Sequence, residues 1–339
     1  MSPLPSAKLV ARVYNRPLPF ASLLCRGSKS IAKRLSYRHL KTMQRDAKEI
    51  ICIGSVLWDI IGRSPREMRA GNDMPGRITR IPGGVAMNIA MTLARFGLSP
   101  VLLSALGRDA AGAELVRAGK DLGLVCDYIH FSQRPTDAYM AIEGANGLIA
   151  AIADAHSLEA AGDAILAPLF NGTLGSTQAP YSGPIALDGN LTVALLDDIA
   201  SSADFADADL RVAPASPGKA QRLLPFIKNS RAVLYVNLEE AVLLCQSEFA
   251  DAALAAQALL DRGAARVLVT NGAQKTADGS KDGIITQQPA QVLVTRVTGA
   301  GDTFMAAHIV AEARGASRET ALEKALDAAA TYVSGESPS

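Results

Sequence analysis

Short apolar runs alternate with amphipathic, helix-like stretches from residue 49 almost to the end of the 339-residue chain. A first buried strand is predicted within 49–61, a second within 100–107, and later strands at 184–188, 209–213, 231–237 and 266–270. Helices are predicted at 84–96, near 111–122 and from about 317. Repeated strand–helix units imply a mostly parallel sheet covered by helices on both faces. The predicted fold class is therefore α/β.

A hairpin-like segment interrupts this alternation at residues 138–153, AYMAIEGANGLIAAIA. Two β-like runs flank an Asn-Gly pair there, which is the pattern of a β-hairpin. A hairpin inserted in a strand–helix series indicates a small sheet that stands off the main body. We expect this sheet to be a lid at about 128–153, and we expect further β-like segments at about 283–295.

The charge of the chain is unevenly distributed. The net charge is +1, yet residues 1–45 contain ten Lys or Arg and no acid, which leaves residues 46–339 with 24 basic and 33 acidic residues and a net charge of −9. An acidic body argues against nucleic acid as the main partner. The four cysteines are scattered without metal-ligand spacing, and no apolar run approaches the roughly 18–20 residues of a membrane span.

The basic leader has the composition of an organelle transit peptide, rich in Arg and Ser and free of acids. Alternatively, translation starts at Met43, just before the first strand. We expect residues 1–45 to be poorly ordered and to lie outside a folded domain at 46–339. The expected location is the cytoplasm, or the mitochondrion if the leader is a transit peptide.

The segment TRVTGAGDTFMAAHIVAE, residues 295–312, combines a Gly-rich turn, an acid and a helix start. Gly299 and Gly301 allow backbone amides to approach an anion, and the helix adds its positive N-terminal end. Asp302 can serve either as a helix cap or as a base. The pattern therefore suits phosphate chemistry but also an ordinary capped helix.

A second Gly-rich turn occurs in IPGGVAMNIA, residues 81–90. Gly83 and Gly84 would let a ligand lie against backbone, and Asn88 can donate to and accept from hydroxyl groups. The same residues also describe a plain strand-to-helix turn with an exposed Asn.

Two further positions carry oxygen ligands. Asp59, predicted at the end of the first strand, suits two vicinal hydroxyls of a sugar, or it caps a turn. In YVNLEEAVLL, Asn237 and Glu240 suit water-mediated Mg²⁺ binding, or they form the capping box of a helix.

A Gly-Gly turn with Asn near the N-terminus, Asn-x-x-Glu two-thirds along the chain and Gly-Ala-Gly-Asp near the C-terminus together resemble the ribokinase-like (PfkB) carbohydrate kinase family over nearly all of residues 49–335. The segment GGVAMNIAMTLARFGLSPVLLSALGRDAAG is similar to the family's N-terminal signature, and VTGAGDTFMAAHIVA to its C-terminal one. The resemblance implies a ribokinase-like, doubly wound, mostly parallel sheet flanked by helices, with a small β-sheet lid.

The resemblance also implies roles for individual residues. Asp302 would be the general base that takes the proton of the attacking hydroxyl. The amides of Gly299, Ala300 and Gly301 would form the anion hole for the transferring phosphoryl group. The residues implied to bind the substrate are Asp59, Gly83, Gly84, Asn88, Thr136 and Tyr139.

ATP and Mg²⁺ are the implied cofactors, with a monovalent cation such as K⁺ as an optional addition. The residues implied on the ATP side are Asn237, Glu240, Thr270, Gly272 and Thr298, with Glu240 holding Mg²⁺ through water. The sequence departs from the family's pattern at Ala213, where an Asp before Pro is usual, and after Gly272, where a second Gly is missing. The implied partners are a small sugar or nucleoside and a second copy that pairs through the lid.

The residues just before Gly-Ala-Gly-Asp in the C-terminal signature favour one branch of the family. Most members read Asp-Thr before Gly-Ala-Gly-Asp, whereas this chain reads Arg296-Val297-Thr298. The pseudouridine kinase branch also lacks that Asp, and MPGRITRIPGGVAMNIA and TDAYMAIEGANGLIAAIAD are similar to it as well. The expected reaction is phosphorylation of the 5′-hydroxyl of pseudouridine by ATP. A ribokinase, fructokinase or inosine kinase remains an alternative, as does a non-catalytic sugar-binding regulator.

Overall fold

The computed structural model describes residues 49–229 and 231–335. These residues belong to one compact unit, residues 48–339. The predicted leader, residues 1–45, and the alternative start at Met43 lie outside the described residues. Within the described ranges, no helix has both the length and the apolar character that crossing a membrane requires.

An eight-stranded sheet forms the centre of this unit, in the order β14-β13-β12-β11-β10-β9-β1-β4. The parallel strands are β1 (Ile51–Ile53), β4 (Val101–Leu103), β9 (Pro184–Asp188), β10 (Asp209–Ala213), β11 (Val233–Asn237) and β12 (Arg266–Thr270). The antiparallel strands β13 (Thr276–Ser280) and β14 (Gly283–Gln287) complete one edge. The predicted mostly parallel, doubly wound sheet is confirmed, because the chain leaves β1 toward β4 and returns through β9 toward β14.

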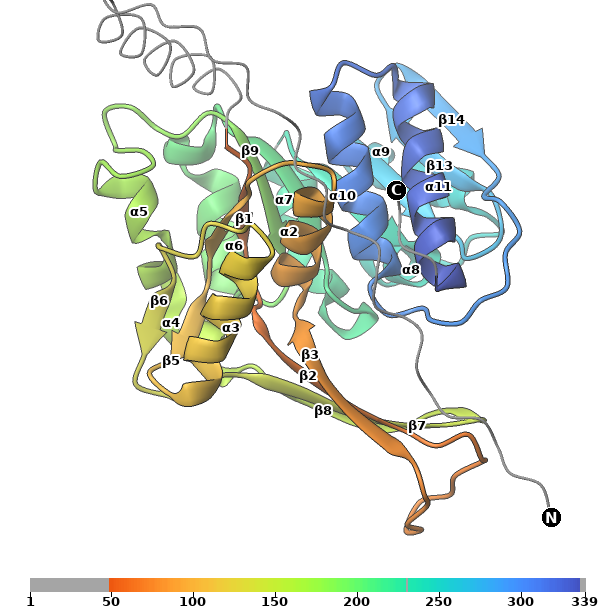
Figure 1. Cartoon of the computed structure of the whole chain (residues 1–339). Helices are drawn as coiled ribbons and strands as arrows, with labels where there is room; N and C mark the ends of the chain where they lie inside the picture. The colour runs from red at the N-terminus through yellow and green to blue at the C-terminus, as the bar shows by residue number, and fades with distance from the viewer. Residues whose placement is uncertain (1–48, 230, 336–339) are drawn as a thin grey trace, which may run out of the picture. The chain divides into compact units, whose positions relative to one another are not determined.

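Helices cover both faces of this sheet (Figure 1). The first face carries α2 (Val85–Arg95), α3 (Ala110–Asp121), α10 (Ala300–Ala313) and α11 (Arg318–Ser334). The second carries α4 (His156–Ala161), α5 (Ala167–Phe170), α6 (Val193–Ser201), α7 (Leu224–Asn229), α8 (Leu238–Cys245) and α9 (Ala252–Asp261), with 3₁₀ turns at Gly162–Leu166, Ala203–Phe205 and Pro217–Leu223. Side chains alternate across β1, where Cys52 packs on the first face and Ile51 and Ile53 on the second.

A separate four-stranded sheet, which we call the lid sheet, projects from the main sheet (Figure 1). Its order is β3 (Arg77–Gly83), β2 (Leu57–Arg63), β7 (Ala138–Gly144) and β8 (Gly147–Asp154). The hairpin read from the sequence is β7 and β8, and it turns at Ala145-Asn146. The earlier part of that segment differs, because β6 (His130–Ser132) pairs with β5 (Ala105–Gly107) in a small sheet of its own.

The apolar run at 49–61 forms two strands rather than the single strand predicted from it. Its first half is β1 of the central sheet and its second half is β2 of the lid sheet. The chain changes sheets at Gly54, whose φ of 145° and close approach to Asp188 leave no room for a side chain. Both halves are apolar because α3 covers the root of β2, where the indole of Trp58 donates to the Ala111 carbonyl at 3.0 Å.

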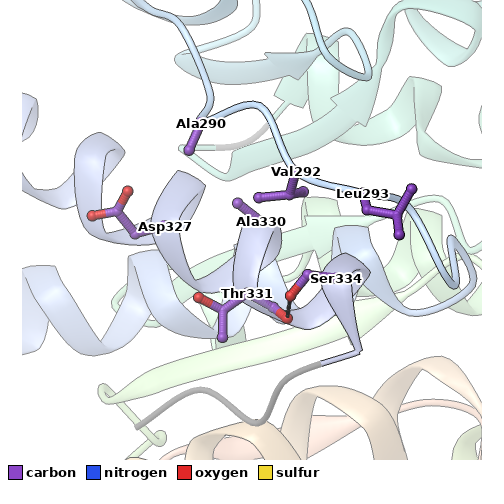
Figure 2. Close-up of a pocket in the computed structure, with 7 residues that line it drawn as sticks. All are labelled: Ala290, Val292, Leu293, Asp327, Ala330, Thr331 and Ser334. Atoms are coloured by element: carbon purple, nitrogen blue, oxygen red, sulfur yellow. Dashed lines mark hydrogen bonds between the residues drawn. The ribbon is translucent and has the colours of Figure 1, made fainter.

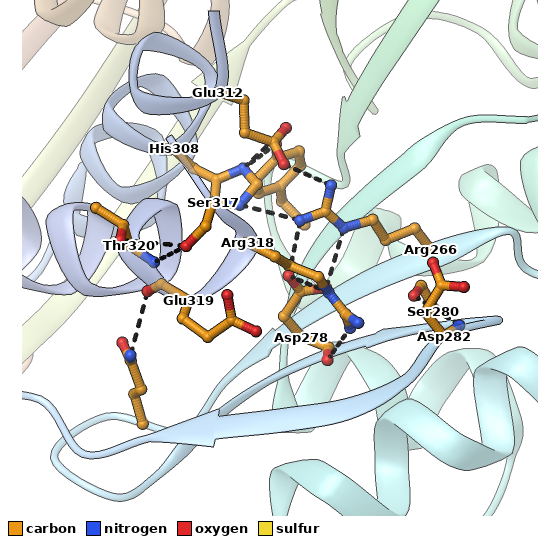
Figure 3. A network of polar contacts seen from close by, with 12 residues as sticks. Arg266, Asp278, Ser280, Asp282, His308, Glu312, Ser317, Arg318, Glu319 and Thr320 are labelled. Atoms are coloured by element: carbon orange, nitrogen blue, oxygen red, sulfur yellow. Dashed lines mark hydrogen bonds and ion pairs between the residues drawn. The ribbon is translucent and has the colours of Figure 1, made fainter. Parts of the chain in front are cut away.

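A network of charged side chains joins α10 and α11 to the sheet (Figure 3). Asp278 in β13 is fully buried and accepts hydrogen bonds from Arg266 in β12 and Arg318 in α11. Arg266 also pairs with Glu312 in α10, with 2.6 Å between Nη1 and Oε1. This network therefore anchors the C-terminal half of α10 to the strands.

Candidate active site

The first turn of α10 leaves several backbone amides free. Gly299 is its N-cap residue, with a φ of 88° that glycine adopts without strain. The amides of Gly299, Gly301 and Asp302 have no acceptor in the described parts of the chain, and a Cβ added at Gly301 would meet nothing within 4 Å. The amide of Ala300 differs from the prediction, because it donates to the Val297 carbonyl at 3.0 Å. The open donors are therefore the amides on either side of it.

Asp302 lies at the third position of α10 and makes no capping hydrogen bond. Its Oδ2 instead accepts a hydrogen bond from Nδ2 of Asn88 in α2, at 2.9 Å. Loss of solvent contact raises the pKa of Asp302 to about 7, and the charges of Asp188, Asp59 and Glu240 add to the rise. A carboxylate with this pKa can exchange a proton near neutral pH.

The start of α2 is closed by side chains, in contrast to the start of α10. Ser55 Oγ accepts from the Val85 amide at 2.8 Å, and Asp188 Oδ2 accepts from the Ala86 amide at 3.1 Å. A Cβ added at Gly84, the N-cap residue, would lie 2.4 Å from the Ser55 carbonyl oxygen. The Gly83-Gly84 turn is thus packed against protein, and of these two helix starts only that of α10 keeps open amides.

Asp59 lies within β2 of the lid sheet and not at the end of a strand of the central sheet, where it was predicted. Its carboxylate rests against Gly83, where an added Cβ would come within 2.1 Å of Oδ2. Burial raises the pKa of Asp59 to about 6. Asp59 faces the same side of the lid sheet as Tyr139, its cross-strand neighbour in β7.

The two predicted lid residues have different surroundings. Tyr139 is half-buried, and its phenol pKa is raised by loss of solvent contact and by the nearby charge of Asp59. Thr136 lies at the root of the lid, where its hydroxyl donates to Asp109 at 2.6 Å and accepts from the Gly107 amide at 3.1 Å. Tyr139 is therefore brought toward Asp59, whereas Thr136 is occupied with holding the lid to the body.

Asn237 and Glu240 form a complete capping box at the start of α8. Asn237 Oδ1 accepts from the Glu240 amide and Glu240 Oε2 accepts from the Asn237 amide, both at 2.8 Å. Burial raises the pKa of Glu240 to about 7. The capping box, which the sequence offered as the alternative to Mg²⁺ binding, is therefore present. One oxygen of Glu240 remains outside the box.

The other predicted ATP-side residues follow the ends of neighbouring strands. Thr270 ends β12 directly beside Asn237 in β11, and Gly272 follows with a φ of 54° in open surroundings. Thr298 lies in the turn before α10, where its carbonyl accepts from the Tyr332 hydroxyl at 2.8 Å. Thr270 thus lies at the turn between β12 and β13, and Thr298 at the start of α10.

A cavity of about 510 Å³ lies between the segment that precedes the α10 turn and helix α11 (Figure 2). The lining residues are Ala290, Val292, Leu293, Asp327, Ala330, Thr331 and Ser334. Its walls are largely apolar, with single polar groups on α11, which suits a flat organic ring better than a phosphate.

Three residues at this site were not among the predicted site residues. Ser55 and Asp188 fix the start of α2, and Tyr332 contacts the α10 turn from the end of α11. Asp188 had a signal in the segment ALDGNL, because a carboxylate at the end of a parallel strand lies at the ligand-binding edge. Ser55 and Tyr332 had none, since their partners lie far away in the sequence.

The described residues contain no cluster of three or more His, Cys, Asp or Glu side chains that could hold a metal ion alone. A magnesium ion bound to ATP needs less, because phosphates and water supply most of its ligands and one or two carboxylates the rest. Glu240 and Asp302 lie close enough for the charge of Glu240 to raise the pKa of Asp302. The Glu240 oxygen outside the capping box is the carboxylate oxygen that would hold such an ion, together with phosphates and water.

Residues 47–339 match the model of one protein family, described as pfkB family carbohydrate kinase. The chain is 28% identical over 303 residues to the bifunctional protein HldE of Hyphomonas neptunium, which covers 84% of this chain and 60% of that protein. It is 27% identical over 294 residues to the ribokinase of Bacillus subtilis, and the match covers 84% of this chain and 93% of that protein. A shorter match, 36% identical over 83 residues, joins it to the pseudouridine kinase of Escherichia coli and covers 24% and 26%.

Solved structures share the fold. A ribokinase of Arabidopsis thaliana, complexed with ribose and ATP, superimposes with a TM-score of 0.69 at 22% identity, covering 85% of this chain and 93% of that one. A sugar kinase structure from Clostridium perfringens gives a TM-score of 0.69 at 24% identity, covering 86% and 90%. At these identities the likeness concerns the fold and not the substrate.

Proposed function

The chain belongs to the pfkB family of carbohydrate kinases, and from this premise we propose that it transfers the γ-phosphoryl group of ATP to the 5′-hydroxyl of pseudouridine. The observation that carries the proposal is the 2.9 Å hydrogen bond between Asn88 and Asp302, beside the open amides of the α10 turn. It combines a hydroxyl-binding group, a base and an anion site within one small region. Phosphoryl transfer to a hydroxyl requires these three parts.

Asp302 acts as the base in this proposal. As the 5′-oxygen forms its bond to the γ-phosphorus, its proton passes to the Asp302 carboxylate and the bond to the β-phosphate oxygen breaks, releasing ADP. The amide of Asn88 orients the carboxylate, and burial together with nearby carboxylates raises its pKa to about 7, close to the pH at which a base works best.

The α10 turn stabilises the charge on the transferring group. In this proposal the free amides of Gly299 and Gly301 bind one anion, with the helix end adding its positive dipole. Ala300 contributes as the residue whose own hydrogen bond shapes the turn. Magnesium, when bound, draws charge from the phosphates, and Glu240 is the carboxylate suited to hold it through water.

The acceptor lies, in this proposal, between the Gly83-Gly84 turn and the lid sheet. Asp59 accepts hydrogen bonds from ribose hydroxyls, and Asn88 can pair with a hydroxyl through its amide oxygen. Tyr139 extends from the same lid face and offers a ring to the nucleobase. The lid excludes water, so that the phosphoryl group reaches the sugar rather than water.

The nucleotide occupies the other side of the α10 turn. The cavity beneath Val292 and Leu293 takes the adenine ring, while Asn237, Thr270, Gly272 and Thr298 follow the path of the phosphates and ribose. Thr136 is left out of the binding surface, because its hydroxyl is already paired on both sides.

Pseudouridine, rather than another acceptor, is favoured by two observations. The match to the Escherichia coli pseudouridine kinase is short, but its 36% identity exceeds that of the longer matches. The chain also lacks the usual Asp before the turn, where it has Arg296, and that branch lacks this Asp as well. The second candidate is a ribokinase-type sugar kinase, favoured by the 93% coverage of the Bacillus subtilis ribokinase.

An assay of ADP release with pseudouridine, uridine, ribose, fructose and inosine tests the proposal. We expect turnover with pseudouridine to exceed that with each other compound by at least about tenfold, because an unpaired polar group in the base site is costly. Turnover of ribose or fructose without turnover of pseudouridine would transfer the assignment to the second candidate. No turnover with any compound would favour a sugar-binding regulator.

We further propose that two copies pair through the lid sheets. The face opposite Asp59 and Tyr139 carries Ile78, Met140, Ile142 and Ile152, all exposed, around the half-buried Ile60. The exposed fractions of Ile78 and Ile152 reach 77% and 69%. A bare apolar face of this kind on a projecting sheet is suited to face-to-face packing with a second sheet.

A further inference from the structure

The last turn of α11 is joined by hydrogen bonds to the segment 295–298, which leads into the α10 turn. The Val333 carbonyl accepts from the amides of Thr295 and Arg296, at 2.8 and 3.3 Å, and from the Thr295 hydroxyl at 3.1 Å. Carbonyl groups at the end of a helix have no partner within the helix. The segment before the anion site supplies those partners.

Arg296 holds the same helix end through its side chain. Its Nε donates to the Tyr332 carbonyl at 2.7 Å, and its guanidinium lies 3.8 Å from the centre of the Tyr332 ring. A positive group at the C-terminus of a helix complements the helix dipole, and the flat guanidinium gains a cation–π contact with the ring. Arg296 therefore caps α11 from outside.

Tyr332 contacts the α10 turn through its hydroxyl group. Its hydroxyl donates to the Thr298 carbonyl at 2.8 Å, one residue before the N-cap residue Gly299. A Cβ added at Gly299 would lie 2.6 Å from this hydroxyl, so the phenol rests directly on the turn. The charge of Asp302 also acts on Tyr332, which places the phenol near the proposed base.

We propose that Arg296 and Tyr332 are positioning residues that hold the α10 turn in the geometry needed to bind the transferring phosphoryl group. This inference rests on the proposed phosphoryl transfer and assigns a purpose to the unusual Arg before Gly-Ala-Gly-Asp. The amides of Gly299 and Gly301 must point at one anion, and an error of about 1 Å in such a site can cost about 10²-fold in rate. A glycine-rich turn cannot hold that geometry by itself, because glycine is the least restricted residue.

Tyr332→Phe tests the proposal, because it removes one hydroxyl and leaves the ring under Arg296. The matched control is Tyr181→Phe, which removes another phenol–carbonyl hydrogen bond, to Glu49, away from the turn. We expect Tyr332→Phe to lower kcat by about 10-fold or more with little change in the KM for the acceptor, and Tyr181→Phe to leave both unchanged. Equal kcat values for Tyr332→Phe and wild type would overturn the proposal.

Hydrogen exchange gives a readout that needs no acceptor. The amides of Ala300 and Thr303 are hydrogen-bonded within the turn, each at 3.0 Å, and report on its opening. We expect them to exchange about tenfold faster in Tyr332→Phe and in Arg296→Gln than in wild type or Tyr181→Phe. Faster exchange in a protein that phosphorylates no tested acceptor would support the positioning role of Arg296 and Tyr332 but refute the proposed function. Unchanged exchange in both variants would refute the positioning role.

Discussion

At the scale of single residues, two Gly-rich turns that look equivalent in the sequence have opposite surroundings. The amides that begin α2 are taken by Ser55 and Asp188, which lie 30 and 102 residues away from their partners in the chain. The amides that begin α10 stay open beside Asp302. Local sequence predicts both turns and the helices behind them, but only the folded chain decides which helix end can receive an anion.

The pKa of Asp302 predicts the pH dependence of turnover. A base with a pKa raised to about 7 is protonated, and inactive, below that pH. We expect kcat/KM for the acceptor to fall as pH drops through about 7 and to level off above it, as measured by initial rates from about pH 6 to 9. A flat profile over this range would contradict the assignment of Asp302 as the base.

Asp302→Asn should separate activity from stability. Turnover should fall by about 10²–10⁴-fold, because the positioned base is lost. The folded state favours the protonated acid, since its pKa lies above the ordinary value, and so the carboxyl group destabilises the protein increasingly as the pH rises from about 4 to about 7. The melting temperature of Asp302→Asn should therefore exceed that of wild type at about pH 8, and the two should converge at about pH 4.

Asp197→Asn, on the exposed side of α6, is the control for this comparison. It should leave turnover and melting temperature as in wild type at both pH values. A variant Asp302→Asn that melts below wild type at about pH 8 would show that the carboxylate is held by favourable contacts and not by repulsive ones.

At the scale of elements, the sequence predicts what is periodic and misses what depends on partners. Helix 84–96 was found as α2 because its apolar positions repeat along one face, and strands 184–188, 209–213 and 266–270 because each is a short, largely apolar segment between helix-like stretches. Strand β13, TADGS, was missed, since its burial depends on the pairing of Asp278 with Arg266 and Arg318. The division of 49–61 between two sheets was missed because both halves are equally apolar.

The predicted β-like segments at 283–295 also illustrate this limit. Only Gly283–Gln287 forms a strand, and the residues that follow lie along α11 and line the cavity beside it. Val292 and Leu293 line this cavity and remain exposed, and they do not pair in a sheet. Their apolar character therefore led to the wrong prediction of a strand.

The charged network beneath α10 predicts a large loss of stability on removal of Asp278 (Figure 3). Asp278→Ala would leave the guanidinium groups of Arg266 and Arg318 without their shared buried carboxylate. We expect a loss of about 3–5 kcal/mol in the free energy of unfolding, measured with urea at neutral pH. Asp127→Ala, which breaks an exposed pair with Lys120, should cause no measurable loss.

The same network sets the acid limit of stability. Burial lowers the pKa of His308 to about 4, so the folded protein keeps this histidine neutral while the unfolded chain takes up a proton below about pH 6.5. The pKa values of Asp278 and Glu312 are also lowered, so their contribution is lost below about pH 4. The contribution of His308, measured as the difference in the free energy of unfolding between wild type and His308→Gln, should fall from about pH 6.5 downward, and a contribution that grows on acidification would contradict this account.

At the scale of the whole molecule, the lid sheet carries two faces with different tasks. One face presents Asp59 and Tyr139 toward the proposed acceptor, and the other presents the exposed side chains of Ile78 and Ile152. The resemblance predicted a lid and pairing through it, but the two additional strands, β2 and β3, emerged only from the fold.

We expect a dimer in sedimentation velocity and a monomer after the double substitution Ile78→Lys and Ile152→Lys. Each lysine would place a charge in the proposed contact between two apolar sheet faces. The control Leu254→Lys changes another exposed apolar residue, on α9 and away from the lid sheet, and should remain dimeric. A wild-type monomer, or a dimer that survives the double substitution, would refute pairing through the lid.

The central claim is phosphoryl transfer to the 5′-oxygen of pseudouridine, with Asp302 as the base. Its most direct measurement is the ³¹P and ¹H NMR spectrum of the product that the protein forms from Mg²⁺, ATP and pseudouridine. We predict one phosphomonoester, coupled to the two protons at carbon 5′, formed by wild type and not by Asp302→Asn in the same time. A phosphate at another position, unchanged pseudouridine, or equal product from Asp302→Asn would contradict the claim.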